Sequence, residues 1–313
     1  MARFVLRRLV QAAAVLVGVS VIVFALVHLV PGDPIRTSLG TRFDQQTYEA
    51  LRERAGFDRP LPVQYVTWAA GAVTGDLGVS FRTGQPVTGT LLERLPATLS
   101  LALAALAVAL LVAVPLGVAS AVRRGSRLDG AATVVSQLGV SVPDFWMAIL
   151  LILLFSGTLG WLPPSGYTPL LEDPLAWAQH IVLPAVTVGL VSGAILTRFV
   201  RSSVLDALGQ DYTRTARSKG LPERTVVRRH VLRNAVVPVL TVTGIQLASL
   251  LGGIIVIEVI FAWPGLGRLT LDAVTARDYP VMQGAVLLVA ALFLLVNLLV
   301  DLLYAVVDPR IRY

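Results

Sequence analysis

The side chains that could carry out chemistry are few in this sequence, and their spacing excludes several kinds of active site. His28, His180 and His230 lie far apart and form no HxxxH pair, and there is no Cys, so we expect no metal site. The single Lys lies in Ser218-Lys219-Gly220, which is not the GxxxxGK[ST] loop that binds ATP. A GxSxG nucleophile and a cytoplasmic carboxylate pair for Mg²⁺ are also missing. We therefore expect no catalytic residue and no cofactor bound by this chain.

The most distinctive polar segment is the basic stretch Asp211–Pro238, which lies between two apolar runs. Its spacing predicts a short helix over Asp211–Lys219, with Asp211 as N-cap and Lys219 in the last turn. Gly220 suits the left-handed position after that turn, and Pro222 favours a new helix start. A helix shorter than about 12–15 residues is marginal in water, so we expect a partner protein to hold it.

Long apolar runs must position these residues. Hydrophobic residues make up 55 % of the 313, and several windows of about twenty residues have no charge, the length that crosses a hydrocarbon core of about 30 Å. The sequence predicts an all-α, multi-pass membrane protein with a third span interrupted at Pro143. The six predicted spans are Leu9–Val30, Ala97–Val122, Ala132–Gly160, His180–Val200, Val236–Ala262 and Gly284–Val307.

The distribution of basic residues predicts the orientation. Of 26 Lys and Arg residues, 17 fall in segments that this topology places in the cytoplasm, and two fall in the short outer loops. Both termini are therefore expected in the cytoplasm, with Pro31–Pro96 as a long outer segment. The net charge of +7 belongs to membrane flanks that contact lipid headgroups, so we expect no nucleic-acid partner.

Four polar residues interrupt the apolar runs, at a cost of about 2.5–3.5 kcal/mol for a charge at the bilayer centre. We interpret them either as lining a translocation cavity or subunit interface, or as ordinary residues near the headgroups: Asp144, Glu258, Asn297 and Asp301. Asn297 and Asp301 are one turn apart and share a helix face.

Two other features concern packing. Gly189 and Gly193 form a GxxxG pair that permits close helix packing. Pro115 and Pro143 are expected to kink the second and third spans.

The segment around Asp211–Lys219 resembles the EAA loop, the coupling helix of bacterial ABC importer permeases, and in particular of the peptide/nickel (Opp/Dpp) family. Arg214-Thr215-Ala216 stands where the general pattern has Glu-Ala-Ala ahead of a Gly, here Gly220. The leading Glu of that pattern is absent. By this resemblance the residues that couple to an ATPase are Asp211, Tyr212, Arg214, Ala216, Lys219, Gly220 and His230.

The resemblance covers essentially the whole chain and is closest to the B-type subunits of that family. It includes His28-Leu29-Val30-Pro31-Gly32-Asp33-Pro34, Gly75-Asp76-Leu77-Gly78, Arg94-Leu95-Pro96-Ala97-Thr98, Glu258-Val259-Ile260-Phe261, Pro264-Gly265-Leu266-Gly267, Arg277-Asp278-Tyr279-Pro280 and Asp308-Pro309-Arg310. It implies a type I ABC importer permease fold. The implied segments are 1–30 (N-terminus and first span), 31–95 (outer segment), 96–308 (permease core, coupling helix within 211–234) and 309–313 (cytoplasmic tail).

The resemblance also implies the partners and the mechanism. They are a homologous second permease in a heterodimer, two cytoplasmic ATPases that bind ATP and Mg²⁺, and an extracytoplasmic substrate-binding protein. Short peptides would cross the bacterial inner membrane by alternating access; nickel, glutathione, haem or another small solute is the alternative cargo. A competing class, an ATP-independent secondary transporter, predicts paired intramembrane charges and an inverted repeat, which the sequence does not display.

Overall fold

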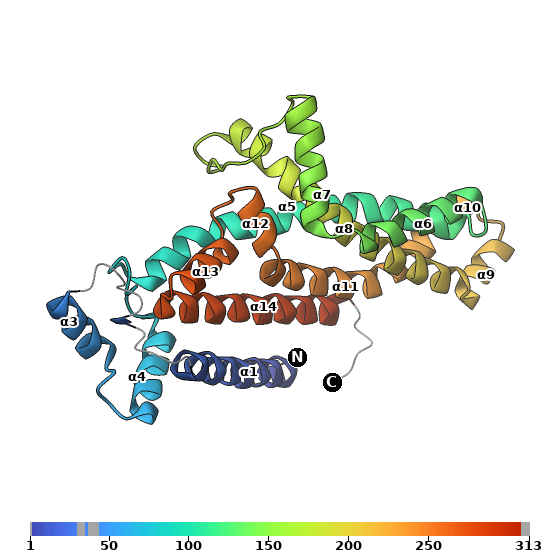
Figure 1. Ribbon diagram of the computed structural model, residues 1–313. Helices are drawn as coiled ribbons and strands as arrows, with labels where there is room; N and C mark the ends of the chain where they lie inside the picture. Colours follow the sequence, from blue (N-terminus) through green and yellow to red (C-terminus); the bar gives the residue numbers. More distant parts are fainter. Residues whose placement is uncertain (1, 30–34, 37–43, 308–313) are drawn as a thin grey trace. The chain divides into compact units, whose positions relative to one another are not determined.

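The computed structural model describes residues 2–29, 35–36 and 44–307, and in these it is built from helices (Figure 1). The described residues form no strand and contain one isolated β-bridge, between Val79 and Pro86. The prediction of an all-α chain is confirmed. The expected tail 309–313 and parts of the outer segment, 30–34 and 37–43, lie outside the described residues.

Five helical segments are long and apolar enough to cross a membrane. They are α1 (Ala2–Leu29), α5 (Val87–Val122), α8 (Pro174–Leu208), the continuous run of α10 (Glu223–Thr225), η3 (Val226–Val231) and α11 (Leu232–Gly253), and α14 (Tyr279–Val307). The third expected span, Ala132–Gly160, is present as two helices with a bend between them. The predicted runs underestimate α5 and α8, because charged and polar turns continue a helix beyond its apolar stretch.

The bend in the third span lies at the proline that the sequence indicated. The helix α6 (Arg127–Ser141) ends before Pro143. The next helix, α7 (Asp144–Leu151), continues into the π-helix η2 (Ile152–Thr158), and this combined helix is bent by 102° relative to α6. Proline has no N–H to bond the preceding turn and disfavours helix at the residue before it, and Val142 is extended (φ −83°, ψ 125°). Helix α5, in contrast, is unbroken through Pro115.

The fifth predicted run is interrupted directly after Gly252 and Gly253, two residues of low helix propensity. Helix α11 ends at Gly253, Ile254 is non-helical, and α12 (Ile255–Ile260) follows. The expected single span Val236–Ala262 is therefore divided into a long and a short helix.

The chain divides into two compact units, and the first contains Met1–Leu99 and Pro264–Leu294. It includes α1, α3 (Gln45–Ala55), α4 (Leu61–Thr74), α13 (Leu266–Thr275) and the beginnings of α5 and α14. The carboxylate of Asp278 accepts hydrogen bonds from the Ser80 hydroxyl and from the Phe81 N–H (3.2 Å). The core of this unit joins these segments through Val87, Leu91, Leu266, Ala273, Val281 and Ala285.

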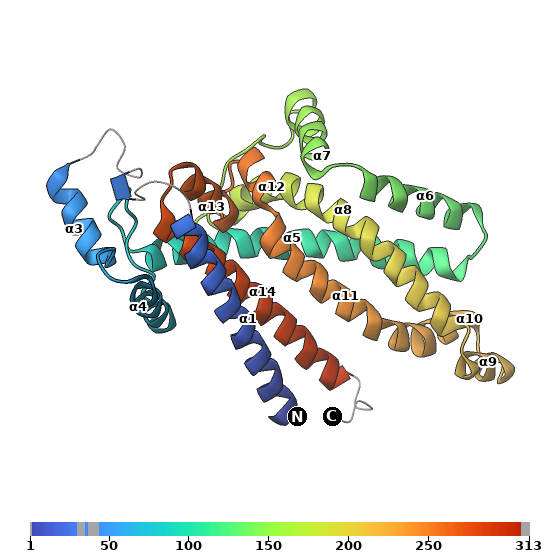
Figure 2. The same ribbon diagram turned by 60° about the horizontal axis from the view of Figure 1, so that its bottom comes forward.

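The second unit contains Ser100–Trp263 and Leu295–Tyr313, and α8 lies at its centre, packed against α6 and α11 (Figure 2). The GxxxG pair of α8 faces α5: a Cβ on Gly189 would lie 2.6 Å from the Val108 side chain, and one on Gly193 would lie 3.2 Å from the Ala109 carbonyl. These glycines let two helices approach closely, as the spacing predicted.

Candidate functional site

The candidate coupling segment forms the short helix α9 (Asp211–Ser218), which follows the end of α8 (Figure 2). Its N-cap is Gln210, with extended backbone (φ −76°, ψ 152°), and Asp211 is the first helical residue. The prediction that Asp211 is the N-cap is therefore wrong by one position. The exposed Asp211 carboxylate lies in the positively polarised first turn, 3.5 Å from Arg214, where a negative charge stabilises the helix.

The end of α9 follows the prediction. Lys219 is the C-cap, and Gly220 is left-handed (φ +75°). The Gly220 N–H donates to the Arg217 carbonyl at 2.9 Å, and the Leu221 N–H donates to the Ala216 carbonyl at 3.4 Å. A left-handed residue here reverses the chain and satisfies the last carbonyls of the helix. Pro222 then caps α10.

One face of α9 is fixed to its own chain. Thr213 is fully buried, and its hydroxyl donates to the Ala207 carbonyl in the last turn of α8 at 2.9 Å. Ala216, one turn later, belongs to the same buried cluster as Val204, Ala207 and Val226. Intrachain packing therefore stabilises the inner face of this short helix, and the partner protein expected from its length stays a prediction.

The opposite face of α9 is open. Tyr212 is 39 % exposed, and Arg214, Thr215, Ser218 and Lys219 are exposed as well. The surface formed by Tyr212, Arg214, Thr215, Ser218 and Lys219, called the outer face of α9 below, combines one aromatic ring with two cations and two hydroxyls.

A solvent-exposed ion pair links α9 to the next helix. The Arg217 guanidinium donates to both carboxylate oxygens of Glu223, at 3.0 and 2.7 Å. This hydrogen bonding raises the pKa of Arg217 above its usual value, so the cation stays charged. A bidentate pair of this kind has a defined geometry and joins the end of α9 to the start of α10.

His230, the last predicted coupling residue, lies in the π-helical segment η3 and is half-buried. Its backbone carbonyl accepts a hydrogen bond from Asn234 at 2.8 Å. The structure thus places His230 on the helix that follows α9 and not on α9 itself. The four arginines of this stretch are exposed: Arg224, Arg228, Arg229 and Arg233.

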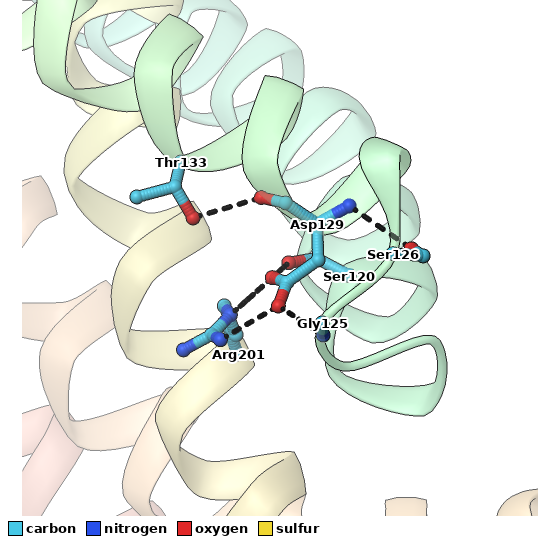
Figure 3. Close-up of polar contacts among 6 residues, drawn as sticks. All are labelled: Ser120, Gly125, Ser126, Asp129, Thr133 and Arg201. Atoms are coloured by element: carbon cyan, nitrogen blue, oxygen red, sulfur yellow. Dashed lines mark hydrogen bonds and ion pairs between the residues drawn. The ribbon is translucent and has the colours of Figure 1, made fainter.

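An ion pair that the sequence analysis missed joins α6 to α8, the helix that precedes α9 (Figure 3). Arg201 of α8 donates to both oxygens of Asp129, at 2.7 and 3.0 Å. Asp129 is 6 % exposed, and it also accepts from the Ser120 hydroxyl (2.5 Å) and the Gly125 N–H (2.9 Å). The cluster joins the end of α5, the following turn, the start of α6 and α8.

The sequence contains a local signal for the Asp129 side of this cluster. Ser126-Arg127-Leu128-Asp129 matches the capping-box spacing, and the Ser126 hydroxyl accepts from the Asp129 N–H at 3.3 Å. The partner cation, 72 positions further along, has no local signature.

The four polar residues predicted for a cavity or interface are spread over three helices. Asp144 begins α7 and is half-buried, and Glu258 on α12 is 1 % exposed. Asn297 and Asp301 are both half-buried on α14, one turn apart. None of the four lines the cavity of about 310 Å³ in the first unit. Among the described residues there is no group of three or more His, Cys, Asp or Glu side chains that could hold a metal ion.

Two solved structures share this fold. A chain of the MetNI methionine ABC transporter in an inward-facing crystal form covers 70 % of this chain and 96 % of its own length, with a TM-score of 0.54 and 19 % identity. A chain of an amino acid ABC transporter crystallised with histidines covers 72 % and 95 %, with a TM-score of 0.50 and 19 % identity. At these identities the likeness shows the fold.

Residues 113–313 match the family described as binding-protein-dependent transport system inner membrane component, and residues 1–102 match its N-terminal companion family. The chain belongs to this family of ABC transporter permeases and is a multi-pass protein of the inner membrane, as the sequence predicted. Over the whole chain it is 46 % identical to a Brucella abortus (strain 2308) protein described as a candidate peptide transport system permease, with full coverage of that protein. It is 42 % identical to the dipeptide transport system permease protein DppB of Escherichia coli (strain K12), covering all of this chain and 99 % of DppB.

Proposed function

We propose that this chain is one permease subunit of an ATP-driven importer that carries short peptides inward across the inner membrane. The permease role agrees with the family, and the peptide cargo is suggested by the names of the full-length relatives. The observation that carries the proposal is the division of α9 into a face held by the chain and an open face that carries Tyr212, Arg214 and Lys219.

The outer face of α9 would be the docking surface of a cytoplasmic ATPase. Its aromatic ring and cations suit an anchor in a pocket surrounded by acidic groups. Movement of the ATPase would reach α8 through the Thr213–Ala207 hydrogen bond and the buried Ala216. It would reach α10 and η3 through the Arg217–Glu223 pair. The two helices that flank α9 would therefore move together.

The complex would contain this chain, a homologous second permease, two ATPases and an extracytoplasmic binding protein. ATP binding would close the ATPases and open the permease pair outward to receive peptide from the binding protein, and ATP hydrolysis would reset it. ATP and Mg²⁺ would be held by the ATPases.

Affinity purification in mild detergent, followed by peptide uptake in cells lacking the chromosomal copy, tests the proposal. The wild-type chain is expected to co-purify with an ATPase and to restore dipeptide uptake. Arg214→Glu reverses one charge of the outer face. Both the co-purified ATPase and the dipeptide uptake are expected to fall by about tenfold or more, because like charges across an interface repel.

Arg124→Glu is the matched control, since Arg124 is an exposed cation on the turn between α5 and α6. Its uptake is expected to equal that of the wild type. If no ATPase co-purifies, or if both variants import peptide normally, α9 is not the docking element. If nickel, glutathione or haem is imported and dipeptides are not, the permease role stands and the cargo is wrong.

A further inference from the structure

The first compact unit contains an open cavity of about 310 Å³, lined by residues that lie outside the coupling segment. Each helix around it contributes one face at helical spacing. The contributing positions are 24, 27 and 28 on α1, 64, 67, 68 and 71 on α4, and 279, 280 and 283 on α14. Three separate elements thus converge on one hollow, as in a small-molecule site.

Aromatic rings form a continuous wall. The ring centroids of Phe24 and Trp68 are 6.0 Å apart, those of Phe24 and His28 are 4.3 Å apart, and those of His28 and Phe57 are 5.8 Å apart. Phe81 continues the wall, 6.2 Å from Phe57. This surface suits an apolar side chain of a ligand.

The wall is held in place by hydrogen bonds between α1 and α4. The hydroxyls of Ser20 and Tyr65 are 2.9 Å apart, and His28 Nε2 lies 3.1 Å from the Gln64 amide oxygen. The Gln64 amide nitrogen donates to the carbonyl of residue 59 at 2.7 Å. A Cβ on Gly71 would lie 2.8 Å from the carbonyl of residue 76, so the floor of the cavity also depends on a close backbone approach. The cavity is therefore preformed.

Three polar groups that line the cavity have no hydrogen-bond partner among the described residues. The indole Nε1–H of Trp68 is buried and unpaired. Gln283 and Tyr279 are each 7 % exposed, and their side chains form no hydrogen bond within the described part of the chain. Leaving a buried donor unpaired is costly, so a ligand carbonyl that accepts from the Trp68 N–H gains binding energy.

The rim of the cavity carries charges of both signs. Glu53, Arg59 and Asp76 are exposed, and none of them forms an ion pair with another described residue. An ammonium group fits the two carboxylates, and a carboxylate fits the guanidinium, which recognises it in a bidentate manner.

We infer that this cavity binds a short zwitterionic peptide of two or three residues. The Trp68 N–H donates to a peptide carbonyl, Gln283 pairs with a peptide amide, and an apolar side chain packs on Phe24 and Phe57. The terminal charges face Asp76 and Arg59 at the rim. A volume of about 310 Å³ is at the lower end for ligand pockets, which favours a dipeptide over a longer chain. The inference rests on the proposed peptide cargo and adds a binding site in the permease itself.

Equilibrium binding of radiolabelled dileucine to the complete transporter in lipid nanodiscs, without the binding protein, tests the site. Trp68→Phe keeps the ring and removes only the N–H, and it is expected to weaken binding roughly three- to tenfold. Trp161→Phe alters an exposed indole (68 % exposed) and serves as the matched control with unchanged affinity. N-acetyl-dileucine amide, which has no terminal charges, is expected to compete roughly tenfold less well than dileucine, because it lacks the charge-assisted hydrogen bonds.

Uptake by the wild-type system with its binding protein separates the two proposals. If the wild type imports dileucine but the nanodisc sample does not bind it, or if both Trp variants bind equally, the cavity site is refuted and the proposed function is untouched. Dileucine import that is absent in the wild type contradicts the proposed cargo instead. A lipid acyl chain in the cavity that dileucine does not displace also overturns the inference.

Discussion

Arg201 and Asp129 form a bidentate ion pair across α8 and α6, with N–O distances of 2.7 and 3.0 Å. Asp129 is 6 % exposed and the Arg201 side chain is 31 % exposed, so Asp129→Asn leaves a partly buried cation without its counter-charge. We expect the free energy of unfolding to fall by about 2–3 kcal/mol, since loss of one member of a buried pair is strongly destabilising. Thermal unfolding in detergent or nanodiscs measures the change.

The exposed pair Arg52–Asp58 provides the control for this experiment, with side chains 47 % and 60 % exposed. Asp58→Asn is expected to cost less than about 1 kcal/mol. The double variant Asp129→Leu/Arg201→Met is expected to regain part of the loss, because apolar residues can replace a buried pair. An equal decrease in the free energy of unfolding in Asp129→Asn and Asp58→Asn would contradict this account of the cluster.

Gly220→Ala places a side chain at a left-handed position (φ +75°). The expected cost is about 1–2 kcal/mol, concentrated at the end of α9. Peptide uptake and ATPase stimulation are therefore expected to fall together while expression stays normal. Gly209 is right-handed (φ −78°), and Gly209→Ala is the matched control. Normal uptake in Gly220→Ala would show that the turn after α9 tolerates distortion.

Thr213→Val keeps the shape of a fully buried side chain and removes the hydroxyl that bonds the Ala207 carbonyl at 2.9 Å. The expected loss is about 1 kcal/mol, seen as faster hydrogen exchange in α9. Thr215→Val alters an exposed hydroxyl two positions away and is expected to leave exchange unchanged. If both variants behave alike, the inner face of α9 is not anchored through Thr213.

Gly189→Ala would bring a methyl group to 2.6 Å from the Val108 side chain and 2.8 Å from the Ala105 carbonyl. Overpacking of this kind costs about 1–3 kcal/mol, so the thermal unfolding midpoint is expected to drop. Gly130 lies in α6, where an added Cβ would have no neighbour within 4 Å, and Gly130→Ala is expected to be neutral or stabilising by about 0.5–1 kcal/mol. A stable Gly189→Ala protein would mean that α5 and α8 separate without penalty.

Local signals in the sequence predicted much of this molecule. Uncharged runs located the spans, Pro143 located the bend, and Gly220 located the end of α9, because each depends on a few consecutive residues. The N-cap of α9 was misplaced by one position because Asp211 also suits the first helical turn, and side-chain type alone does not separate the two places.

Contacts between distant positions could not be predicted in the same way. Asp129 and Arg201 are far apart in the chain, and nothing in either local pattern identifies the other. The support of α9 by Ala207 depends on the angle at which α8 ends. The length rule for isolated helices, which led us to expect a partner protein, could not reveal this contact within the chain. The break at Ile254 follows Gly252 and Gly253, a local signal that the sequence analysis passed over because the run has no proline and is otherwise apolar.

The position of Lys219 has a practical consequence. It is the single lysine of the chain, and it stands exposed at the C-cap of α9. Apart from the terminal amine, an amine-reactive dye or cross-linker therefore has one labelling site on this polypeptide, on the surface proposed to contact the ATPase. Labelling there gives a reporter of docking that needs no engineered cysteine.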